Sequence, residues 1–562
     1  MERTDSFYDL VSRLMHDTLS VSLPGFRPEL VLCATIVVLL LARMPRWGYR
    51  IHAFYLAFIG TLVALYYAAP WNNLSANEAV HDKLLGSALF DGMLIYDTFT
   101  VYFRTVLLVF VLLFLVFTWL SGIPDREDSP DFYSLVLGAT IGMCLMASAN
   151  NLFAVFLGVE MASVPSYVLA GMLKGRRVSS EAALKYSVYG AGTAGVMLYG
   201  ISLLAGALGS LHLPTMVSQL AAMPADVLAE RQMVLVLGGL MLMVGLAFKL
   251  SAVPFHFWCP DVFEGASAEV DAFLSVASKA AALALLVRVA IGMSHLPEEP
   301  VVSSQLSVAT VSTVSLATDN GQPTTDSLSE ARHYIVGLLA LISAITCTFG
   351  NLAAYGQTNI KRLLAYSTIA HAGYMMMPVV AAVQFSESEP ALAEAALAGL
   401  CMYVGVYLFM NLGAFAIVAF LRNAMRSEEI ADYAGLIRQA PGVVICMSII
   451  FVSLLGLPPL AGFAAKFAIF APLAARPSEY PLLMWLLVIG GLNTVVSLFY
   501  YLRVVKVMTL DPESPDRLPV HFSLISLEGV YVVLITIPVV VLGVAWDALN
   551  RWAQAAAQTV LS

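Results

Sequence analysis

The sequence predicts an all-α, polytopic membrane protein of about fourteen transmembrane helices, because its composition is apolar and its apolar stretches have membrane-spanning length. Of its 562 residues, 59% are hydrophobic and 12% are charged, whereas soluble domains contain about 25% charged residues. Stretches of about 17–25 apolar residues, the helix length that a hydrocarbon core of ~30 Å requires, recur along the chain. The expected spans are 29–44, 51–69, 100–121, 132–149, 151–173, 181–207, 233–261, 269–293, 333–353, 362–384, 393–421, 440–472, 482–508 and 524–548.

Lysine and arginine are distributed unevenly among the loops, and their distribution predicts the orientation. Loops after even-numbered spans contain little beyond Lys83, Arg231, Arg332 and Arg476. Loops after odd-numbered spans contain Arg43, Arg46, Arg50, Lys174, Arg176, Arg177, Lys361, Arg362, Arg422, Arg426, Arg438 and Lys506. Because positive loops stay in the cytoplasm, we expect both termini on the outer side. The first twenty residues lack a compact apolar segment, so we expect no cleavable signal peptide.

The six cysteines give no sign of a cofactor site. Each is alone in or beside an apolar stretch, so we expect no iron–sulfur cluster, zinc site or disulfide framework. The chain also lacks GxGxxG after a strand pattern and GxxxxGK[ST], which argues against nucleotide binding. We therefore expect no cofactor, metal or nucleic acid on this chain, and its driving energy must come from elsewhere.

Four ionisable residues lie deep inside expected spans: Glu160, Lys249, Lys279 and Lys466. A charge at mid-bilayer costs from about 2.5–3.5 to more than 10 kcal/mol, so such residues normally face the protein interior and line a pathway. A lysine side chain reaches only ~6 Å, about four residues of helix, so snorkelling does not explain Lys249. Desolvation disfavours the charged forms, so buried lysine and glutamate can exchange protons near neutral pH. We predict that these four residues carry protons.

Other ionisable residues in the spans allow two interpretations. Lys185 lies about a turn inside its span, so it is as compatible with snorkelling as with a place in the pathway. His256 and His371 are equally compatible with satisfied core groups and with proton relays. We treat these three as auxiliary residues. Arg288 is expected to snorkel.

Prolines beside two of the lysines predict broken helices. Pro254 follows Lys249 by five residues, and Pro458 and Pro459 precede Lys466. A proline alone is compatible with a packing kink, but a proline beside a deep lysine occurs twice. Broken backbone at membrane depth must be buried in protein or line a cavity. The breaks fall in the seventh and twelfth spans, and broken helices in corresponding halves indicate inverted repeats.

These breaks lead us to expect two inverted five-helix repeats within five segments. The segments are N-terminal helices in 1–131, a first five-helix unit in 132–293, a Ser/Thr-rich external loop in 294–332, a second five-helix unit in 333–508 and a C-terminal helix in 509–562. The loop is rich in turn residues and carries no expected chemistry.

Seven motifs, in order and at suitable separations, resemble the subunit N (subunit 2) family of respiratory complex I, the proton-pumping NADH:quinone oxidoreductase. They are EAALKYSVYG, FKLSAVPFHFWCPDVFEG, FLSVASKAAA, QTNIKRLLAYSTIAHAGY, MNLGAF, GLPPLAGFAAKF and NTVVSLFYYLRVVKVM. The resemblance covers about 132–508. The second and fourth motifs favour subunit N over its antiporter-like sisters.

The resemblance implies two inverted five-helix half-channels in a bacterial inner membrane, beside other antiporter-like and small helical subunits. It implies proton translocation coupled to quinone reduction, with NAD, FMN, iron–sulfur clusters and quinone in partner subunits. The proton-translocating positions it implies are Glu160, Lys249, Lys279 and Lys466, with Lys185 and His256 as auxiliary residues.

The chain departs from the family pattern at one point and leaves other functions open. Where the family reads EGAPTPVTAF, this chain reads EGASAEVDAF, which introduces Glu269 and Asp271. Because acids suit a helix N-terminus, we expect different capping or hydration there. The alternatives are a cation/proton antiporter or membrane-hydrogenase subunit with the same helices, and a structural subunit that does not pump. A complex fed by ferredoxin also fits, because no residue here contacts the electron donor.

Overall fold

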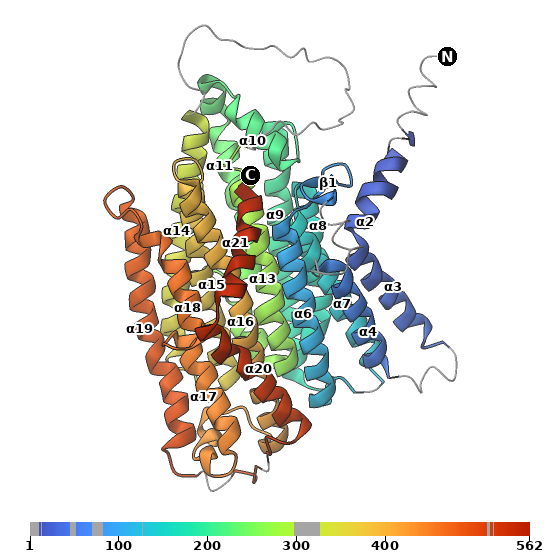
Figure 1. Ribbon diagram of the computed structural model, residues 1–562, viewed down its shortest axis with the longest axis vertical. Coiled ribbons are helices and arrows are strands. Elements are labelled where there is room, and N and C mark those ends of the chain that lie inside the picture. The colour runs from blue at the N-terminus through green and yellow to red at the C-terminus, as the bar shows by residue number, and fades with distance from the viewer. Residues whose placement is uncertain are drawn as a thin grey trace.

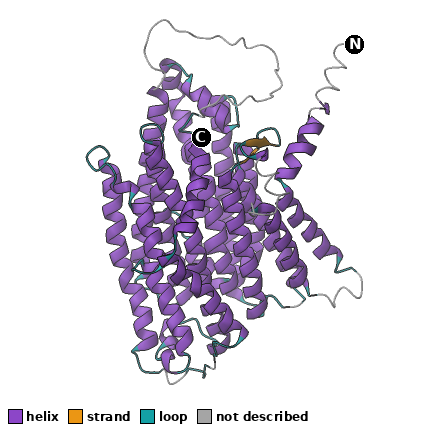
Figure 2. Ribbon diagram, viewed as in Figure 1, coloured by secondary structure: helices purple, strands orange, loops and turns teal. Residues whose placement is uncertain are grey.

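The protein folds into an upright bundle of long helices (Figure 1). The computed structural model describes residues 11–12, 14–44, 52–69, 83–125, 127–296, 326–513, 517–520 and 522–561. Within these ranges the only sheet is an antiparallel hairpin of β1 (Ser87–Leu89) and β2 (Leu94–Tyr96) (Figure 2). The prediction of an all-α fold is confirmed.

The helices fall into three groups along the chain. The N-terminal group is η1 (Thr18–Ser22), α2 (Leu23–Gly25), α3 (Arg27–Leu41), α4 (Ala53–Ala68) and α6 (Thr98–Ser121). The central group is α7 (Ser129–Ser148), α8 (Leu152–Ala170), α9 (Arg177–Leu208), α10 (Leu213–Ala221), α11 (Ala225–Leu250), α12 (Trp258–Gly265) and α13 (Ala268–Gly292). The C-terminal group is α14 (Asp326–Ala354), α15 (Ile360–Phe385), α16 (Pro390–Met425), η3 (Ile430–Tyr433), η4 (Leu436–Arg438), α17 (Pro441–Leu455), α18 (Ala461–Phe470), η5 (Pro472–Ala474), α19 (Pro481–Thr509), α20 (Leu527–Val544) and α21 (Asp547–Leu561).

Each predicted span falls on a helix or on a pair of helices, but the number fourteen is not confirmed. Among the described residues, 11 helices are long and apolar enough to cross a membrane, or 12 if a pair bent by 80° before α3 counts as one span. The other predicted spans correspond to α4 and to the pair α17 and α18, which are shorter apolar helices. The difference arises because a break divides the span at 440–472 into α17 and α18, and because α4 has only 16 residues.

Both predicted helix breaks are present. α11 ends at Leu250, and Ser251 then has a left-handed backbone with φ of 55° before the chain resumes in α12. α17 ends at Leu455, and Gly456 has φ of 88° before α18. The last carbonyls of a helix have no intrahelical partner. Each break therefore presents hydrogen-bond acceptors inside the bundle.

Aromatic packing holds the first break in place. Trp258 Nε1 donates to the Phe248 carbonyl at 3.0 Å, and the indole stacks on the Tyr186 ring of α9 with centroids 4.3 Å apart. The Val253 amide donates to Thr346 Oγ1 of α14 at 3.0 Å. These contacts orient the end of α11, which carries the lysine that the sequence singled out.

Three helices occupy the centre of the bundle. The apolar window of α13 is 100% buried and those of α15 and α16 are 94% buried, against 28% for α19 and 33% for α20. Lipid tails are as apolar as leucine, so exposed apolar side chains on α19 and α20 suit the perimeter. Ionisable residues on α13 and α15 are instead surrounded by protein.

Several helices, among them η1, α2, α10 and α21, were not predicted as separate elements, and one predicted segment is largely outside the described residues. α10 is a short helix, and α21 buries Ala553, Ala556, Ala557 and Leu561 on one stripe. Alanine and polar residues give α21 a low hydropathy, so it did not register as a separate apolar stretch. Of the predicted external loop at 294–332, residues 297–325 lie outside the described residues, and α14 begins at Asp326.

Candidate functional site

Glu160 of α8 and Lys249 of α11 form a pair without a direct bond, and only Lys249 is fully buried. Lys249 is 1% exposed, and its charge interacts with that of the half-buried Glu160. Neither Lys249 Nζ nor Glu160 Oε1 has a hydrogen-bond partner in the part of the chain that the structure describes. Two coupled groups without fixed partners titrate together, so the proton occupancy of one changes that of the other.

Lys279 lies where α13 passes the first break. It is 1% exposed, and its Nζ donates to the Leu250 carbonyl at 3.2 Å and to the Thr368 carbonyl of α15 at 3.3 Å. Leu250 is the last residue of α11 and adjoins Lys249. Lys279 therefore binds the open end of the broken helix that carries Lys249.

Lys466 has an equivalent position at the second break. It lies in α18 and is 4% exposed, and its Nζ donates to the Leu455 carbonyl at the end of α17 at 2.9 Å. The ammonium lies 4.8 Å from the centroid of the Tyr374 ring, a cation–π distance. At both breaks a buried lysine thus binds an open helix-end carbonyl.

His371 of α15 links the two breaks. It interacts electrostatically with both Lys279 and Lys466. Its Nδ1 lies 2.7 Å from Tyr403 Oη, and its Nε2 lies 3.3 Å from Tyr501 Oη. Imidazole and hydroxyl groups can each donate and accept a hydrogen bond. These three side chains can therefore pass a proton among themselves.

Asn351 of α14 connects the second lysine to the same group of side chains. Its Nδ2 donates to Tyr374 Oη at 3.1 Å, and its Oδ1 accepts from Tyr500 Oη at 3.0 Å. The Tyr500 ring packs on that of Tyr501 with centroids 4.4 Å apart. A line of polar side chains, which we call the polar line, runs from Lys279 through His371 to Lys466.

The sequence analysis missed the phenol and amide members of the polar line. One signal was available, because Tyr403, Tyr407 and Asn411 recur every four residues and so share one face of α16. Asn411 Nδ2 donates to Tyr407 Oη at 2.6 Å and lies 3.4 Å from Thr368 Oγ1. A polar stripe at helical spacing inside an apolar span would have indicated this face.

The predicted auxiliary residues lie in three different settings. Of them, His371 lies between the lysines of the polar line. His256 is 2% exposed within the first break, with its ring 4.4 Å from that of Phe349. Lys185 forms ion pairs with Asp261 of α12 at 2.8 Å and with Glu181 at 2.9 Å, and its side chain is 39% exposed. Lys185 therefore ties α9 to α12 rather than entering the polar line.

The expectation that Arg288 snorkels is wrong. It is 8% exposed, and its guanidinium makes two hydrogen bonds of 2.6 Å to the Asp97 carboxylate and one of 2.8 Å to Thr100 Oγ1. Asp97 is 191 residues away in sequence, so only packing could reveal the pair. A second buried pair, Glu29 Oε1 with Arg104 Nε at 2.8 Å, was also missed.

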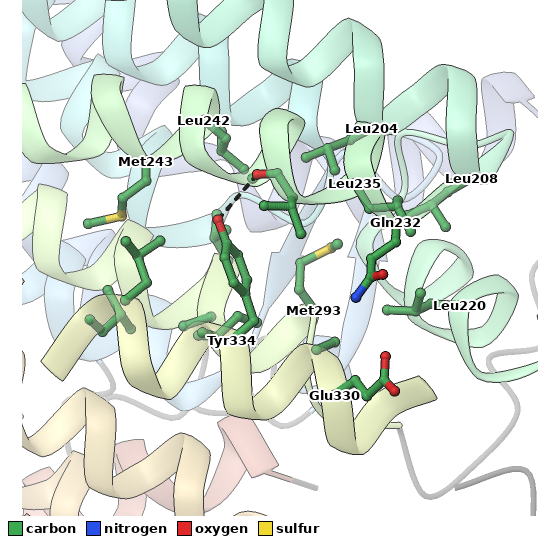
Figure 3. Close-up of a pocket in the computed structure, with 18 of the residues that line it drawn as sticks. Leu204, Leu208, Leu220, Gln232, Leu235, Leu242, Met243, Met293, Glu330 and Tyr334 are labelled. Atoms are coloured by element: carbon green, nitrogen blue, oxygen red, sulfur yellow. Dashed lines mark hydrogen bonds between the residues drawn. The ribbon is translucent and has the colours of Figure 1, made fainter. Parts of the chain in front are cut away.

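A cavity of about 230 Å³ lies apart from the polar line, among α9, α10, α11, α13 and α14 (Figure 3). Its walls are mostly leucine and methionine, with Gln232, Glu330 and Tyr334 as polar groups. Tyr334 Oη donates to the Val236 carbonyl at 3.2 Å. The cavity contains none of the residues predicted to carry protons. Across the described ranges, no three His, Cys, Asp or Glu side chains are grouped to hold a metal ion.

Comparison with known proteins gives matches over most of the chain. The family model described as NADH:quinone oxidoreductase/Mrp antiporter, TM, matches residues 149–326 and 323–496. NADH-quinone oxidoreductase subunit N of Anaeromyxobacter sp. (strain Fw109-5) is 35% identical over 99% of both chains. Subunit N 2 of Sorangium cellulosum (strain So ce56) is 37% identical over 93% of this chain and 95% of its own.

Solved structures match the fold as well. A chain of respiratory complex I from Thermus thermophilus with bound aureothin is 28% identical with a TM-score of 0.66, over 93% of this chain and 98% of its own. A chain of the Mrp complex from Dietzia sp. DQ12-45-1b has a TM-score of 0.72, over 96% of this chain and 100% of its own. Its 17% identity shows likeness of fold alone.

The broken helices, the buried lysines and these matches define an antiporter-like polytopic membrane protein. Within that class, identity of 35–37% over nearly full-length curated relatives is decisive. The chain belongs to the NADH-quinone oxidoreductase subunit N family. The resemblance drawn from the sequence motifs is confirmed.

Replacing Tyr501 by phenylalanine tests the hydrogen bonds around His371. The change removes one hydroxyl and keeps the ring that packs on Tyr500. The hydroxyl bonds both His371 Nε2 and Ser367 Oγ. Because each hydrogen bond contributes about 0.5–1.5 kcal/mol, we expect quinone reductase turnover to fall by at least roughly two- to tenfold in an assembled complex. Tyr199→Phe, at a ring that is 57% exposed, is the matched control and is expected to be unchanged. Equal turnover in both variants would contradict a role for the hydroxyl.

Proposed function

We propose that the chain translocates protons across a bacterial inner membrane as a membrane-arm subunit of NADH:quinone oxidoreductase. One observation carries the proposal: Lys279 and Lys466 each bind an open carbonyl at a broken helix, and His371 interacts with both. Quinone reduction supplies the energy in partner subunits, which hold the NAD, FMN, iron–sulfur and quinone sites. The partners of this chain are other antiporter-like and small helical subunits, and the lipid bilayer.

Protons pass from Glu160 and Lys249 to Lys279, and then through His371 to Lys466. A positive charge on Lys279 repels one on His371, because burial weakens dielectric screening between them. Such repulsion moves the proton on His371 onward to Lys466 once Lys279 is protonated. Moving one proton against 100 mV costs about 2.3 kcal/mol. A change of about two units in a pKa supplies that amount, at 1.36 kcal/mol per unit.

The same proposal includes the two-unit organisation and the orientation. The family model matches the chain twice, and each match contains one broken helix and its lysine, which supports inverted units at 132–293 and 333–508. The excess of lysine and arginine in loops after odd-numbered spans supports cytoplasmic loops there, with both termini outside.

Lys249→Ala in membrane vesicles tests the function. Proton pumping and quinone reductase activity are measured together, and assembly of the complex is checked by native gel. We expect both activities to fall by more than about tenfold, since proton-transfer groups typically contribute on the order of 10²–10⁴-fold. Lys506→Ala is the matched control, because that lysine lies in the last turn of α19 with its side chain 63% exposed.

The outcomes separate the alternatives. Wild-type pumping and turnover in an assembled Lys249→Ala complex would show that the chain is a structural subunit and not a proton pump. Turnover that requires Na⁺ and moves Na⁺ in place of protons would favour a cation antiporter. Loss of both activities in Lys249→Ala, with Lys506→Ala unchanged, supports proton translocation.

A further inference from the structure

Two buried acids stand in the first turn of α13. Glu269 is 1% exposed and Asp271 is 0% exposed. All four of their carboxylate oxygens are buried without a hydrogen-bond partner among the described residues. Neither acid is the N-cap of the helix. Ser267 is the N-cap, and its side chain accepts from the Val270 amide at 3.4 Å. Capping therefore does not explain why two acids are buried at the start of α13.

The charges around these acids leave one negative charge in excess. Asp271 interacts electrostatically with Lys361, Arg422, Glu428 and Glu269. Lys361 is already engaged, since its Nζ pairs with Glu428 at 3.0 Å, and Arg422 lies 3.4 Å from the same carboxylate. Two cations thus face three carboxylates, and one proton on Asp271 neutralises the group. Burying an unpaired carboxylate is far more costly than burying a neutral acid.

The helix itself leads from these acids to the polar line. Asp271, Ser275 and Lys279 are spaced by four residues and so share a face of α13, about 6 Å apart at each step. The buried Cys259 thiol of α12 interacts with both Asp271 and Lys279, which places all three groups toward α12. Ser275 is 0% exposed and provides a hydroxyl between the two ionisable groups.

We propose that Asp271 holds an exchangeable proton and forms an uptake branch that delivers it along α13 to Lys279. The proposal rests on the proposed function of Lys279. Asp271 gives its proton to the Ser275 hydroxyl, which turns from the Ala272 carbonyl, to which it donates at 3.0 Å, and passes its own proton to the neutral amine of Lys279. The products are a carboxylate and an ammonium. The Asp271 carboxylate is then reprotonated from the face of the bundle where Lys361 lies.

Chemical rescue by a small acid tests the branch. Asp271→Asn keeps the size of the side chain and removes the carboxyl group. In the assembled complex with an uncoupler present, we expect NADH:quinone reductase turnover to fall by roughly tenfold, less than the 10²–10⁴-fold typical of a lost proton-transfer group, because the route from Lys249 to Lys279 remains. Added formate, a permeant acid, is expected to restore turnover several-fold. A defect in packing alone would not respond to formate.

Two further variants sharpen the result. Asp271→Glu keeps a carboxyl group and is expected to stay within about twofold of the wild type. Asp226→Asn, at an exposed acid in the first turn of α11, is the matched control and is expected to be unchanged. If Asp271→Asn does not assemble, Asp271→Ser is assayed in the same way.

The outcomes also distinguish this proposal from the proposed function. Wild-type turnover in Asp271→Asn, or a loss that formate does not relieve, overturns the uptake branch. Lys279→Ala is measured alongside. If Lys279→Ala is inactive while Asp271→Asn is active, only the branch fails. If Lys279→Ala is active, the proposed function fails with it.

Discussion

Lys279→Met is expected to abolish proton pumping and quinone reduction together in an assembled complex. Methionine has a similar length and suits a helix interior, so α13 should keep its place. The variant removes the ammonium that bridges the Leu250 and Thr368 carbonyls, and with it the first lysine of the polar line, which interacts with His371. Because a proton-transfer group contributes on the order of 10²–10⁴-fold, we expect at least about a hundredfold loss. The loss of activity is measured as quinone reductase turnover and proton pumping in vesicles, with assembly checked by native gel.

Lys279→Arg separates a proton carrier from a structural cation. Arginine keeps a positive charge and five N–H donors, but it does not lose its proton in proteins. We therefore expect Lys279→Arg to assemble and to remain as inactive as Lys279→Met. Wild-type turnover in Lys279→Arg would show that the site needs only a fixed charge. Lys506→Met, at the exposed end of α19, controls for the loss of a lysine elsewhere.

Arg288→Leu is expected to prevent stable assembly. The change leaves the Asp97 carboxylate, which is 2% exposed, without its two bonds from the guanidinium. Breaking a buried ion pair by removing one partner typically costs about 3–5 kcal/mol, because the other charge stays buried and uncompensated. We expect a lower melting temperature and less complex on native gels. If Arg288 instead snorkelled to the headgroups, the same variant would hardly change the melting temperature or the amount of complex.

A second variant isolates the unpaired charge as the cause. Asp97 also caps α6 by accepting from the Thr100 amide at 2.8 Å, and asparagine serves as well as aspartate at that position. Arg288→Leu combined with Asp97→Asn removes the charge and keeps the cap. We expect this double variant to recover most of the assembled complex. A double variant no more stable than Arg288→Leu would mean that the lost packing of Arg288, and not the stranded carboxylate, is responsible.

Much of the candidate site was predictable from local features of the chain. Glu160, Lys249, Lys279 and Lys466 were identified because a charge within a long apolar stretch is costly. Three of them, the lysines, are at most 4% exposed. The phenol and amide groups of the polar line were missed, since a single tyrosine or asparagine in an apolar stretch carries no charge whose burial would be costly. Arg288 was misjudged because its partner lies outside its own helix.

Membrane class, helix breaks and deep ionisable residues follow from properties that act within one helix: apolar length, the missing amide of proline and the cost of desolvation. Which of these groups meet depends on how distant helices pack. Lys279 reaches the Leu250 carbonyl across 29 residues, His371 reaches Tyr501 across 130, and Arg288 reaches Asp97 across 191. Such contacts form because buried polar groups must find partners inside the bundle, where lipid offers none. The tertiary arrangement of the helices therefore selects each partner.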